Sequence, residues 1–347
     1  MYNVLSGSGW FCCLHEGPDV TQPIFLISLP RAGSTLLQKM LSVSPSIASA
    51  AEPWIMLPVA MMRDQDAMKA IYSSHTAAKA IDDFIDAIPD GEICFDKAMS
   101  GFARGIYSAA ADGAPFFLDK TPRYYLIVDD LMRLFPEAKF IFLVRNPLAV
   151  LASIGNTFYK GRLCWFDYWV DWLLGHENMA RAIQTANSMD NSTVVRYEEL
   201  VSEPTQQLSR LSEWLGVPFS EDMLTKYRDI SWSGKMGDPI GVSSYRSVSK
   251  RSTTEWQSFY ASRFRKNVGS KMLDKIPSDS LSIMGYPVEK LKNDLYALPN
   301  SSGLDLPARA NYVANQICTI VDYRSWKLRR KGKKNGKRYS CGRLLGG

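Results

Sequence analysis

The sequence is poor in the residues that build metal centres and disulfide frameworks. It has three histidines and six cysteines, and no two cysteines form a Cys-x-x-Cys pair. We therefore expect no metal, and the scattered cysteines are typical of a reducing compartment. No apolar run reaches the length of a membrane span, and the first residues lack the pattern of a secretory signal. These absences together predict a cytoplasmic protein.

The excess of basic over acidic residues is also small over most of the chain. The net charge of +6 comes from 41 basic and 35 acidic residues, and much of the excess lies in residues 324–343. Basic residues elsewhere need only serve a local site. No basic stretch is interleaved with aromatic residues, so nucleic acid is not expected as the substrate. The basic tail is predicted to be flexible, and contact with a membrane or a polyanion stays open.

The chain shows no internal repeat, and its 347 residues suffice for one large domain. Residues 1–22 are irregular and are interpreted as an N-terminal extension. Polar and proline-rich segments after residue 290 lead into the basic tail. The predicted organisation is therefore an extension at 1–22, one domain at 23–300 and a tail at 301–347.

Short apolar segments alternate with helical patterns through the predicted domain. Strands are predicted at 23–28, 116–118, 139–144 and near 192–196; helices are predicted at 35–43, 57–88 with an interruption near 73–76, 96–111, 123–135, from 147, 165–188 and 204–216. This alternation predicts an α/β fold with a mostly parallel sheet flanked by helices. Ligands bind at the carboxyl ends of such strands, where Arg31, Lys120, Arg145 and Tyr197 fall.

The loop after the first predicted strand, "LPRAGSTLLQKML", has the shape of a phosphate-binding turn. A helix N-terminus attracts anions, Gly33 allows close approach of the backbone, and Ser34 and Thr35 offer hydroxyl donors. The usual Gly-Lys-Ser/Thr ending is missing, and Arg31 stands before the glycine instead. The alternative interpretation is an ordinary strand-to-helix turn that a hydroxyl side chain caps.

A second unit, "FIFLVRNPLAVLAS", repeats the strand-loop-helix plan. Asn146 precedes Pro147, so it is predicted to cap a helix whose first residue is the proline. Arg145 ends the strand and Ser153 lies eight residues further on. A ligand lying along the start of this helix would reach both side chains. Alternatively, they are a surface arginine and a helix serine that faces solvent.

These segments resemble motifs of the sulfotransferases that use 3′-phosphoadenosine 5′-phosphosulfate (PAPS). "PIFLISLPRAGSTLLQKML" resembles the 5′-phosphosulfate loop, "FIFLVRNPLAVLAS" the 3′-phosphate motif, and "VVRYEELVSEP" the segment near the adenine. The resemblance spans about residues 23–260 and implies a P-loop-like fold. The nucleotide-binding residues that it implies are Arg31, Ala32, Gly33, Ser34 and Thr35 for the phosphosulfate, Arg145 and Ser153 for the 3′-phosphate, and Tyr197 near the adenine.

The resemblance also implies catalytic residues. Protein-tyrosine sulfotransferases and several bacterial relatives use a glutamate shortly after the first helix, and Glu52 stands in the matching place. Lys120, in "FFLDKTPRY", matches a family lysine near the bridging oxygen, and Arg31 completes the predicted catalytic set. His15, His75 and His176 match no family motif. The alternative for Glu52 is a structural carboxylate paired with a neighbouring arginine.

Two further features leave alternatives open. "PFFLD" resembles a strand whose aspartate, Asp119, would hold magnesium in a P-loop small-molecule kinase. We favour a structural role for Asp119, in which it orients Lys120 or Arg123. The late segment 237–256 offers Arg246, Ser247, Lys250 and Arg251 as additional ligands of the 3′-phosphate, in an uncertain register. A mobile basic loop is the other interpretation of this segment.

The favoured function is transfer of a sulfuryl group from PAPS to a hydroxyl. The glutamate-type site favours a carbohydrate, or a natural-product or acyl-chain alcohol, over phenols and steroids. A P-loop kinase and a non-catalytic nucleotide-binding protein are the alternatives.

Overall fold

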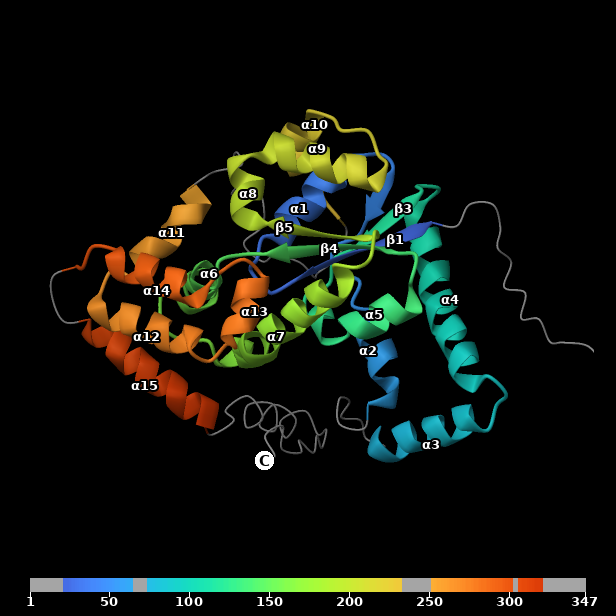
Figure 1. Ribbon diagram of the computed structural model, residues 1–347, viewed down its shortest axis with the longest axis horizontal. Helices are drawn as coiled ribbons and strands as arrows, with labels where there is room; N and C mark the ends of the chain where they lie inside the picture. Colours follow the sequence, from blue (N-terminus) through green and yellow to red (C-terminus); the bar gives the residue numbers. More distant parts are fainter. Residues whose placement is uncertain (1–20, 65–73, 233–250, 302–304, 321–347) are drawn as a thin grey trace, which may run out of the picture.

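A five-stranded parallel sheet, with the strand order β2-β3-β1-β4-β5, forms the centre of the protein (Figure 1). The computed structural model describes residues 21–64, 74–232, 251–301 and 305–320. The strands are β1 (Gln22–Ser28), β2 (Ile47–Ser49), β3 (Phe116–Asp119), β4 (Lys139–Val144) and β5 (Ser192–Arg196). The predicted parallel sheet is confirmed. Because β1 lies between β3 and β4, the loops after these three strands meet at one edge.

Alternating side chains of the strands supply two separate cores. In β1, Ile24 and Leu26 enter one core, whereas Phe25 and Ile27 enter the other, and all four are fully buried. The central strands of a parallel sheet are covered on both faces, so their sequences are continuously apolar. This explains why "PIFLIS" and "KFIFLV" show no polar alternation.

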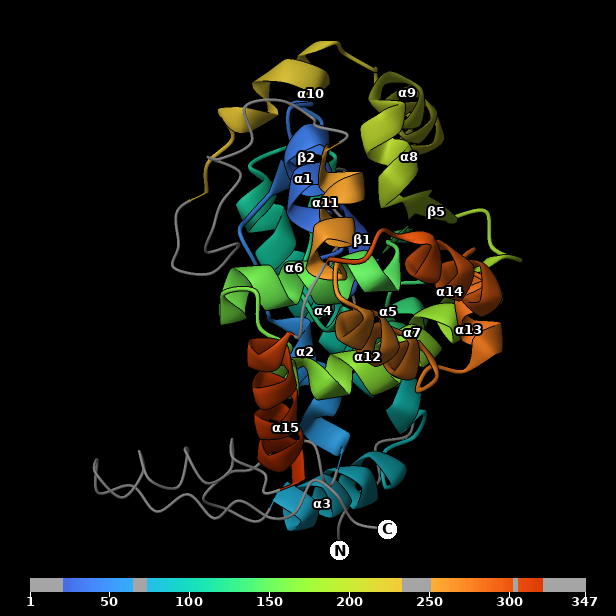
Figure 2. The same cartoon turned by 90° about the vertical axis from the view of Figure 1, so that its left-hand side faces the viewer.

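Helices cover both faces of the sheet (Figure 1). On one face lie α1 (Ser34–Leu41), α8 (Tyr197–Ser202), α9 (Pro204–Leu215), α10 (Asp222–Thr225) and η4 (Lys226–Arg228). On the other face lie α2 (Met56–Ala60), α4 (Gly91–Ala111), η2 (Tyr124–Leu126), α5 (Val128–Leu134), α6 (Pro147–Tyr159), η3 (Phe166–Tyr168) and α7 (Trp169–Ala186). The helices α11 (Arg251–Phe259), α12 (Arg263–Leu273), α13 (Ser278–Ile283) and α14 (Val288–Ala297) pack on α6, on α7 and on one another. Figure 2 shows α11 in front of α6, against which it packs.

Several predicted elements differ in their bounds. The short edge strand β2 was not predicted. The predicted helix 123–135 begins only after Arg123, which adopts a left-handed φ of 75°, and it is divided into η2 and α5 at Ile127, which is not helical. The predicted helix 57–88 becomes α2, η1 (Met61–Arg63) and α3 (Ser74–Asp86), with residues 65–73 outside the described part. Helix α9 ends at Gly216 in the left-handed conformation, as predicted.

The packed structure continues past residue 300, where the sequence predicts the end of the domain. Helix α15 (Leu306–Ile320) packs against α12, and its Ala308 is fully buried. The boundaries at 22 and 300 stay predictions, since residues 1–20 and 321–347 lie outside the described part of the chain. Among the helices of the described residues, none is both long and apolar enough to cross a membrane.

Candidate active site

The loop after β1 is shaped by two residues with positive φ. Arg31 has a φ of 66°, and Gly33, which precedes the first residue of α1, has a φ of 98°. A Cβ atom on Gly33 would lie 2.3 Å from two ring carbons of Tyr197. Glycine is therefore required both by the turn and by the ring that packs on it. The contact joins the predicted phosphosulfate loop to the predicted adenine residue.

The Arg31 side chain reaches across to α6. Its Nε donates a hydrogen bond to Ser153 Oγ at 3.3 Å, and its Nη2 donates to Thr157 Oγ1 at 3.4 Å. The guanidinium carbon lies 5.8 Å from the centroid of the Phe158 ring. The structure thus brings together Arg31 and Ser153, which the sequence assigned to opposite ends of the nucleotide. Thr157 and Phe158, one turn further along the helix, were not predicted.

Arg145 connects the ends of three strands. Its Nη1 donates to the carbonyl oxygen of Arg31 at 2.9 Å, and its guanidinium lies 4.3 Å from the centroid of the Tyr197 ring. The following helix begins as predicted: the Asn146 side chain caps it by accepting from the Leu148 N–H at 2.9 Å. A cationic group is therefore fixed beside the N-termini of two helices, an arrangement that suits a phosphate ligand.

Glu52 and Lys120 form a buried ion pair. Lys120 Nζ lies 2.7 Å from Glu52 Oε1, and the two side chains are 3% and 10% exposed, respectively. The partner of Glu52 is therefore a lysine, not the arginine of the alternative interpretation. The second oxygen, Oε2, accepts from Trp54 Nε1 at 3.2 Å. The pair places a carboxylate and an ammonium group at the carboxyl end of β3.

Asp119 is fully buried, and hydroxyl groups occupy both of its oxygens. Thr121 donates to Oδ1 at 2.8 Å, while Tyr107 and Tyr124 donate to Oδ2 at 2.7 and 2.8 Å. Burial raises the pKa of Asp119, and these hydrogen bonds oppose the change. The contacts favour the structural role, although the orienting hydrogen bonds reach Thr121 and the two tyrosines, not Lys120 or Arg123. A carboxylate enclosed in this way is poorly placed to hold magnesium.

The structure describes two of the three histidines, and neither lies at the strand ends. His75 is exposed on α3. His176 is buried in α7, where its Nδ1 lies 3.0 Å from the Trp172 carbonyl oxygen. Burial lowers the pKa of His176 to about 4. His15, Arg246, Ser247 and Lys250 lie outside the described residues, and Arg251 is the first residue of α11.

His176 should make the stability of the protein depend on pH. In the unfolded chain the imidazole titrates near 6.5, whereas in the folded protein its pKa is about 4. Between these values the unfolded state binds the extra proton, so stability falls as the pH falls. Urea unfolding of the wild type and of His176→Gln at pH 7 and pH 4 should show about 3 kcal/mol more loss in the wild type. Equal losses would contradict a buried neutral imidazole.

A second ion pair, partly buried, was missed by the sequence analysis. Arg123 donates to both carboxylate oxygens of Asp171 in α7, at 3.0 and 2.9 Å, and Tyr125 donates to Oδ1 of the same carboxylate at 2.7 Å. Only the position of Arg123 directly after "DKTP" hinted at a role. The pair ties the loop after β3 to α7.

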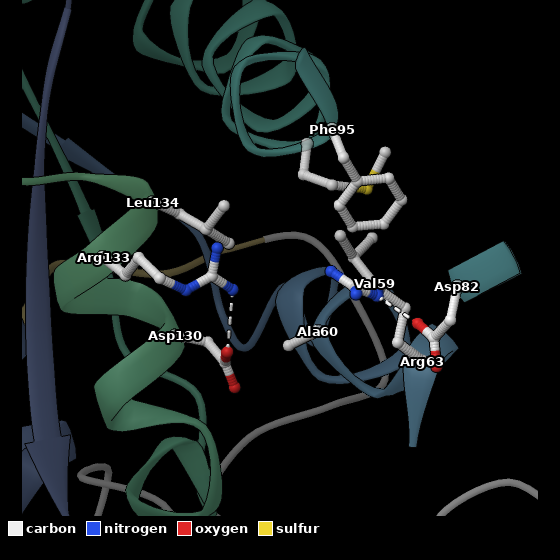
Figure 3. A pocket seen from close by; sticks show the side chains of 9 residues that line it. Val59, Ala60, Arg63, Asp82, Phe95, Asp130, Arg133 and Leu134 are labelled. Carbon is white, nitrogen blue, oxygen red and sulfur yellow. Dashed lines mark hydrogen bonds and ion pairs between the residues drawn. The ribbon is translucent and has the colours of Figure 1, made fainter. Parts of the chain in front are cut away.

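A cavity of about 240 Å³ lies between α2, η1, α3, α4 and α5 (Figure 3). It is lined by Val59, Ala60, Arg63, Asp82, Phe95, Met99, Asp130, Arg133 and Leu134. Arg63 is paired with Asp82, and Arg133 with Asp130, so these positive charges are already matched. None of the lining residues belongs to the loops after β1, β3 or β4. This cavity is therefore not the candidate site.

Comparison with known proteins shows the family. A sequence profile of the sulfotransferase family matches residues 23–221. Nodulation protein NoeE of Sinorhizobium fredii is 28% identical over 287 residues, which cover 76% of this chain and 65% of NoeE. Protein-tyrosine sulfotransferase 1 of Homo sapiens is 30% identical over 293 residues, covering 81% of this chain and 72% of that protein.

The chain belongs to the sulfotransferase family, because the family profile matches more than half of its residues. The predicted family, and with it the transferase class, is confirmed. Among solved structures, the sulfotransferase domain of the Synechococcus PCC 7002 olefin synthase is similar, with 25% identity and a TM-score of 0.47. That alignment covers 69% of this chain and 88% of the domain.

Proposed function

We propose that this protein transfers a sulfuryl group from PAPS to the hydroxyl of an acceptor. The observation that carries the proposal is the buried pair of Glu52 and Lys120 at the end of β3, next to the Arg31 loop of β1. A carboxylate can accept the proton of the attacking hydroxyl, and an ammonium group can stabilise the leaving phosphate oxygen. Transfer to a hydroxyl requires both groups within one site.

Each group then has a defined part in the proposed reaction. The acceptor oxygen forms a bond to sulfur while the bond from sulfur to the bridging phosphate oxygen breaks. The acceptor proton goes to Glu52, and the electron pair of the broken bond stays on the phosphate, beside Lys120 and Arg31. The products are the sulfated acceptor and 3′,5′-adenosine diphosphate. Arg145 and Ser153 are proposed to hold the 3′-phosphate, and Tyr197 to lie near the adenine.

The surroundings of Asp119 disfavour the kinase alternative. A kinase of this fold type needs a carboxylate that reaches the metal bound to its nucleotide, and in this chain the corresponding oxygens accept from three hydroxyls. The donor proposed here presents one phosphate at its 5′ end. Arg31, Lys120 and backbone amides of the loop suffice for that phosphate without a metal.

For the acceptor we propose a carbohydrate, or a natural-product or acyl-chain alcohol. Two aromatic rings lie near Arg31: Phe158 stacks on Tyr168, with 5.4 Å between the ring centroids. Such rings offer a flat apolar surface on which a sugar ring or an alkyl chain can pack. Such rings would also accept a tyrosine, and relatives named protein-tyrosine sulfotransferases make a tyrosine of a protein the second candidate. A cytoplasmic location and contact of the basic tail with a membrane or polyanion remain proposals.

An assay with PAPS labelled in its sulfuryl group tests the proposed function. The purified protein should move the label to a hydroxyl in the presence of EDTA, because no metal takes part in the proposed step. Parallel reactions with an oligosaccharide, a long-chain alcohol and a tyrosine peptide would distinguish the acceptor classes. The same preparation is tested for binding of ATP with magnesium.

Strict dependence of transfer on magnesium would contradict the proposal and favour the kinase. Binding of 3′,5′-adenosine diphosphate without release of label to any acceptor would favour a non-catalytic nucleotide-binding protein.

A further inference from the structure

We propose that Trp54 is a positioning residue that holds Glu52 in the orientation for accepting the acceptor proton; this inference rests on the proposed function. The two oxygens of Glu52 have different donors. Lys120 Nζ lies 2.7 Å from Oε1, and Trp54 Nε1 donates to Oε2 at 3.2 Å. A hydrogen bond to an ionised carboxylate is stronger than one between neutral groups and fixes the plane of the carboxylate.

The Trp54 backbone adopts a conformation that bulky residues rarely adopt. Its φ is 59°, in the left-handed region, which is costly for a side chain of this size. The backbone N–H of Trp54 donates to Thr121 Oγ1 at 3.1 Å, and that hydroxyl donates to Asp119 Oδ1 at 2.8 Å. The surrounding contacts therefore hold the strained residue in place.

A second connection anchors the same segment two residues later. The backbone N–H of Met56 donates to the Tyr124 hydroxyl at 3.3 Å, and this hydroxyl donates to Asp119 Oδ2 at 2.8 Å. Two backbone amides on the Glu52 segment are thus tied, each through one hydroxyl, to one buried carboxylate on β3. The indole is consequently presented to Glu52 by a rigid support, as orientation of a catalytic group requires.

The two oxygens of Glu52 have separate donors, and this separation matters during the proposed reaction. Lys120 is shared, because the leaving phosphate oxygen competes with Glu52 for the same ammonium group. The Trp54 ring packs against the core, and its N–H donates to Oε2, a bond that it can keep throughout the reaction. Oε1 then remains the oxygen directed at the acceptor while Lys120 moves towards the phosphate. Loss of the indole N–H should therefore slow the chemical step without weakening the binding of nucleotide.

Trp54→Phe removes the donor and keeps an aromatic ring. We expect kcat to fall by at least about tenfold, the loss typical of one hydrogen bond to a charged group, with little change in the affinity for 3′,5′-adenosine diphosphate. Trp214→Phe is the matched control, since Trp214 Nε1 also donates at 3.2 Å, to the Asp190 carbonyl oxygen beyond the opposite ends of the strands. The control should keep the wild-type kcat.

A double-mutant cycle with Glu52→Gln separates positioning from a structural role. If Trp54 acts through Glu52, adding Trp54→Phe to Glu52→Gln should change the residual kcat by less than about twofold. A further tenfold loss in that background would overturn the proposal, as would an unchanged kcat in Trp54→Phe alone. If Trp54→Phe does not fold, Thr121→Val removes the anchor of the Trp54 backbone, and the same cycle and criteria apply.

Failure of the positioning role can be distinguished from failure of the proposed function. A wild-type protein that transfers no label from PAPS contradicts the sulfotransferase proposal itself. A wild-type protein that transfers label, with Trp54→Phe equally active, contradicts only the positioning role.

Discussion

Glu52→Gln is expected to lower turnover by at least about 10²-fold, or roughly 2.7 kcal/mol in the barrier, while the affinity for 3′,5′-adenosine diphosphate changes little. Glutamine keeps the shape of the side chain and an oxygen that accepts hydrogen bonds, but it does not take the acceptor proton at neutral pH. The proposed nucleotide ligands lie on the loops after β1, β4 and β5, whereas Glu52 lies on the segment after β2. Turnover and nucleotide affinity, measured on one preparation, check this expectation.

The melting temperature does not distinguish a base from a structural carboxylate at this position. Lys120 is 3% exposed, so removing the charge of its partner leaves a poorly compensated buried ammonium group. Breaking such a pair is destabilising by about 3–5 kcal/mol in general, and less where a hydrogen bond survives, as glutamine allows. A lower melting temperature is therefore expected whether or not Glu52 is the base.

Glu137→Gln is the control for loss of a carboxylate from an ion pair. Glu137 pairs with Arg104 just before β4, at the opposite end of the sheet. This variant should retain the wild-type turnover. Near-normal turnover in Glu52→Gln would exclude Glu52 as the base and return attention to the histidines.

Arg145→Ala is expected to abolish most of the preference for 3′,5′-adenosine diphosphate over 5′-AMP. A hydrogen bond to a charged group contributes about 1.5–3 kcal/mol, which corresponds to roughly 10- to 150-fold in affinity. Arg145 also bonds the Arg31 carbonyl and lies on the Tyr197 ring, so its loss should weaken binding of both nucleotides as well. The ratio of the two dissociation constants, measured by calorimetry, isolates the contribution of the 3′-phosphate.

Arg210→Ala serves as the control for removal of an arginine that supports a strand. Arg210 is an exposed residue of α9 and donates to the Val194 carbonyl oxygen of β5. Its removal should leave the ratio of dissociation constants unchanged. Equal affinity of the wild-type protein for the two nucleotides would contradict the assignment of Arg145 and Ser153 to the 3′-phosphate.

Local sequence predicted the central strands and the residues that follow them. Buried parallel strands are continuous apolar runs, and Asn146-Pro147 marks a helix start, so both can be read from adjacent residues. The three-residue strand β2 escaped prediction because its partner β3 lies about 70 residues further along the chain. The break of the predicted helix at Ile127 also escaped prediction. Arg123 and Tyr125, just before it, bond Asp171 of α7, which lies more than 40 residues further along the chain.

The sequence by itself determined the family, the parallel sheet, and the placement of Arg31, Lys120 and Arg145 after strands, since each depends on short motifs and their order. Only the tertiary structure decided which side chains meet. The pairing of Glu52 with Lys120, the anchoring of the Trp54 N–H by Thr121, and the contact of Gly33 with Tyr197 all join residues of different loops. Such contacts depend on the strand order, which brings the carboxyl ends of β3, β1 and β4 to one edge, and no local pattern encodes the resulting distances.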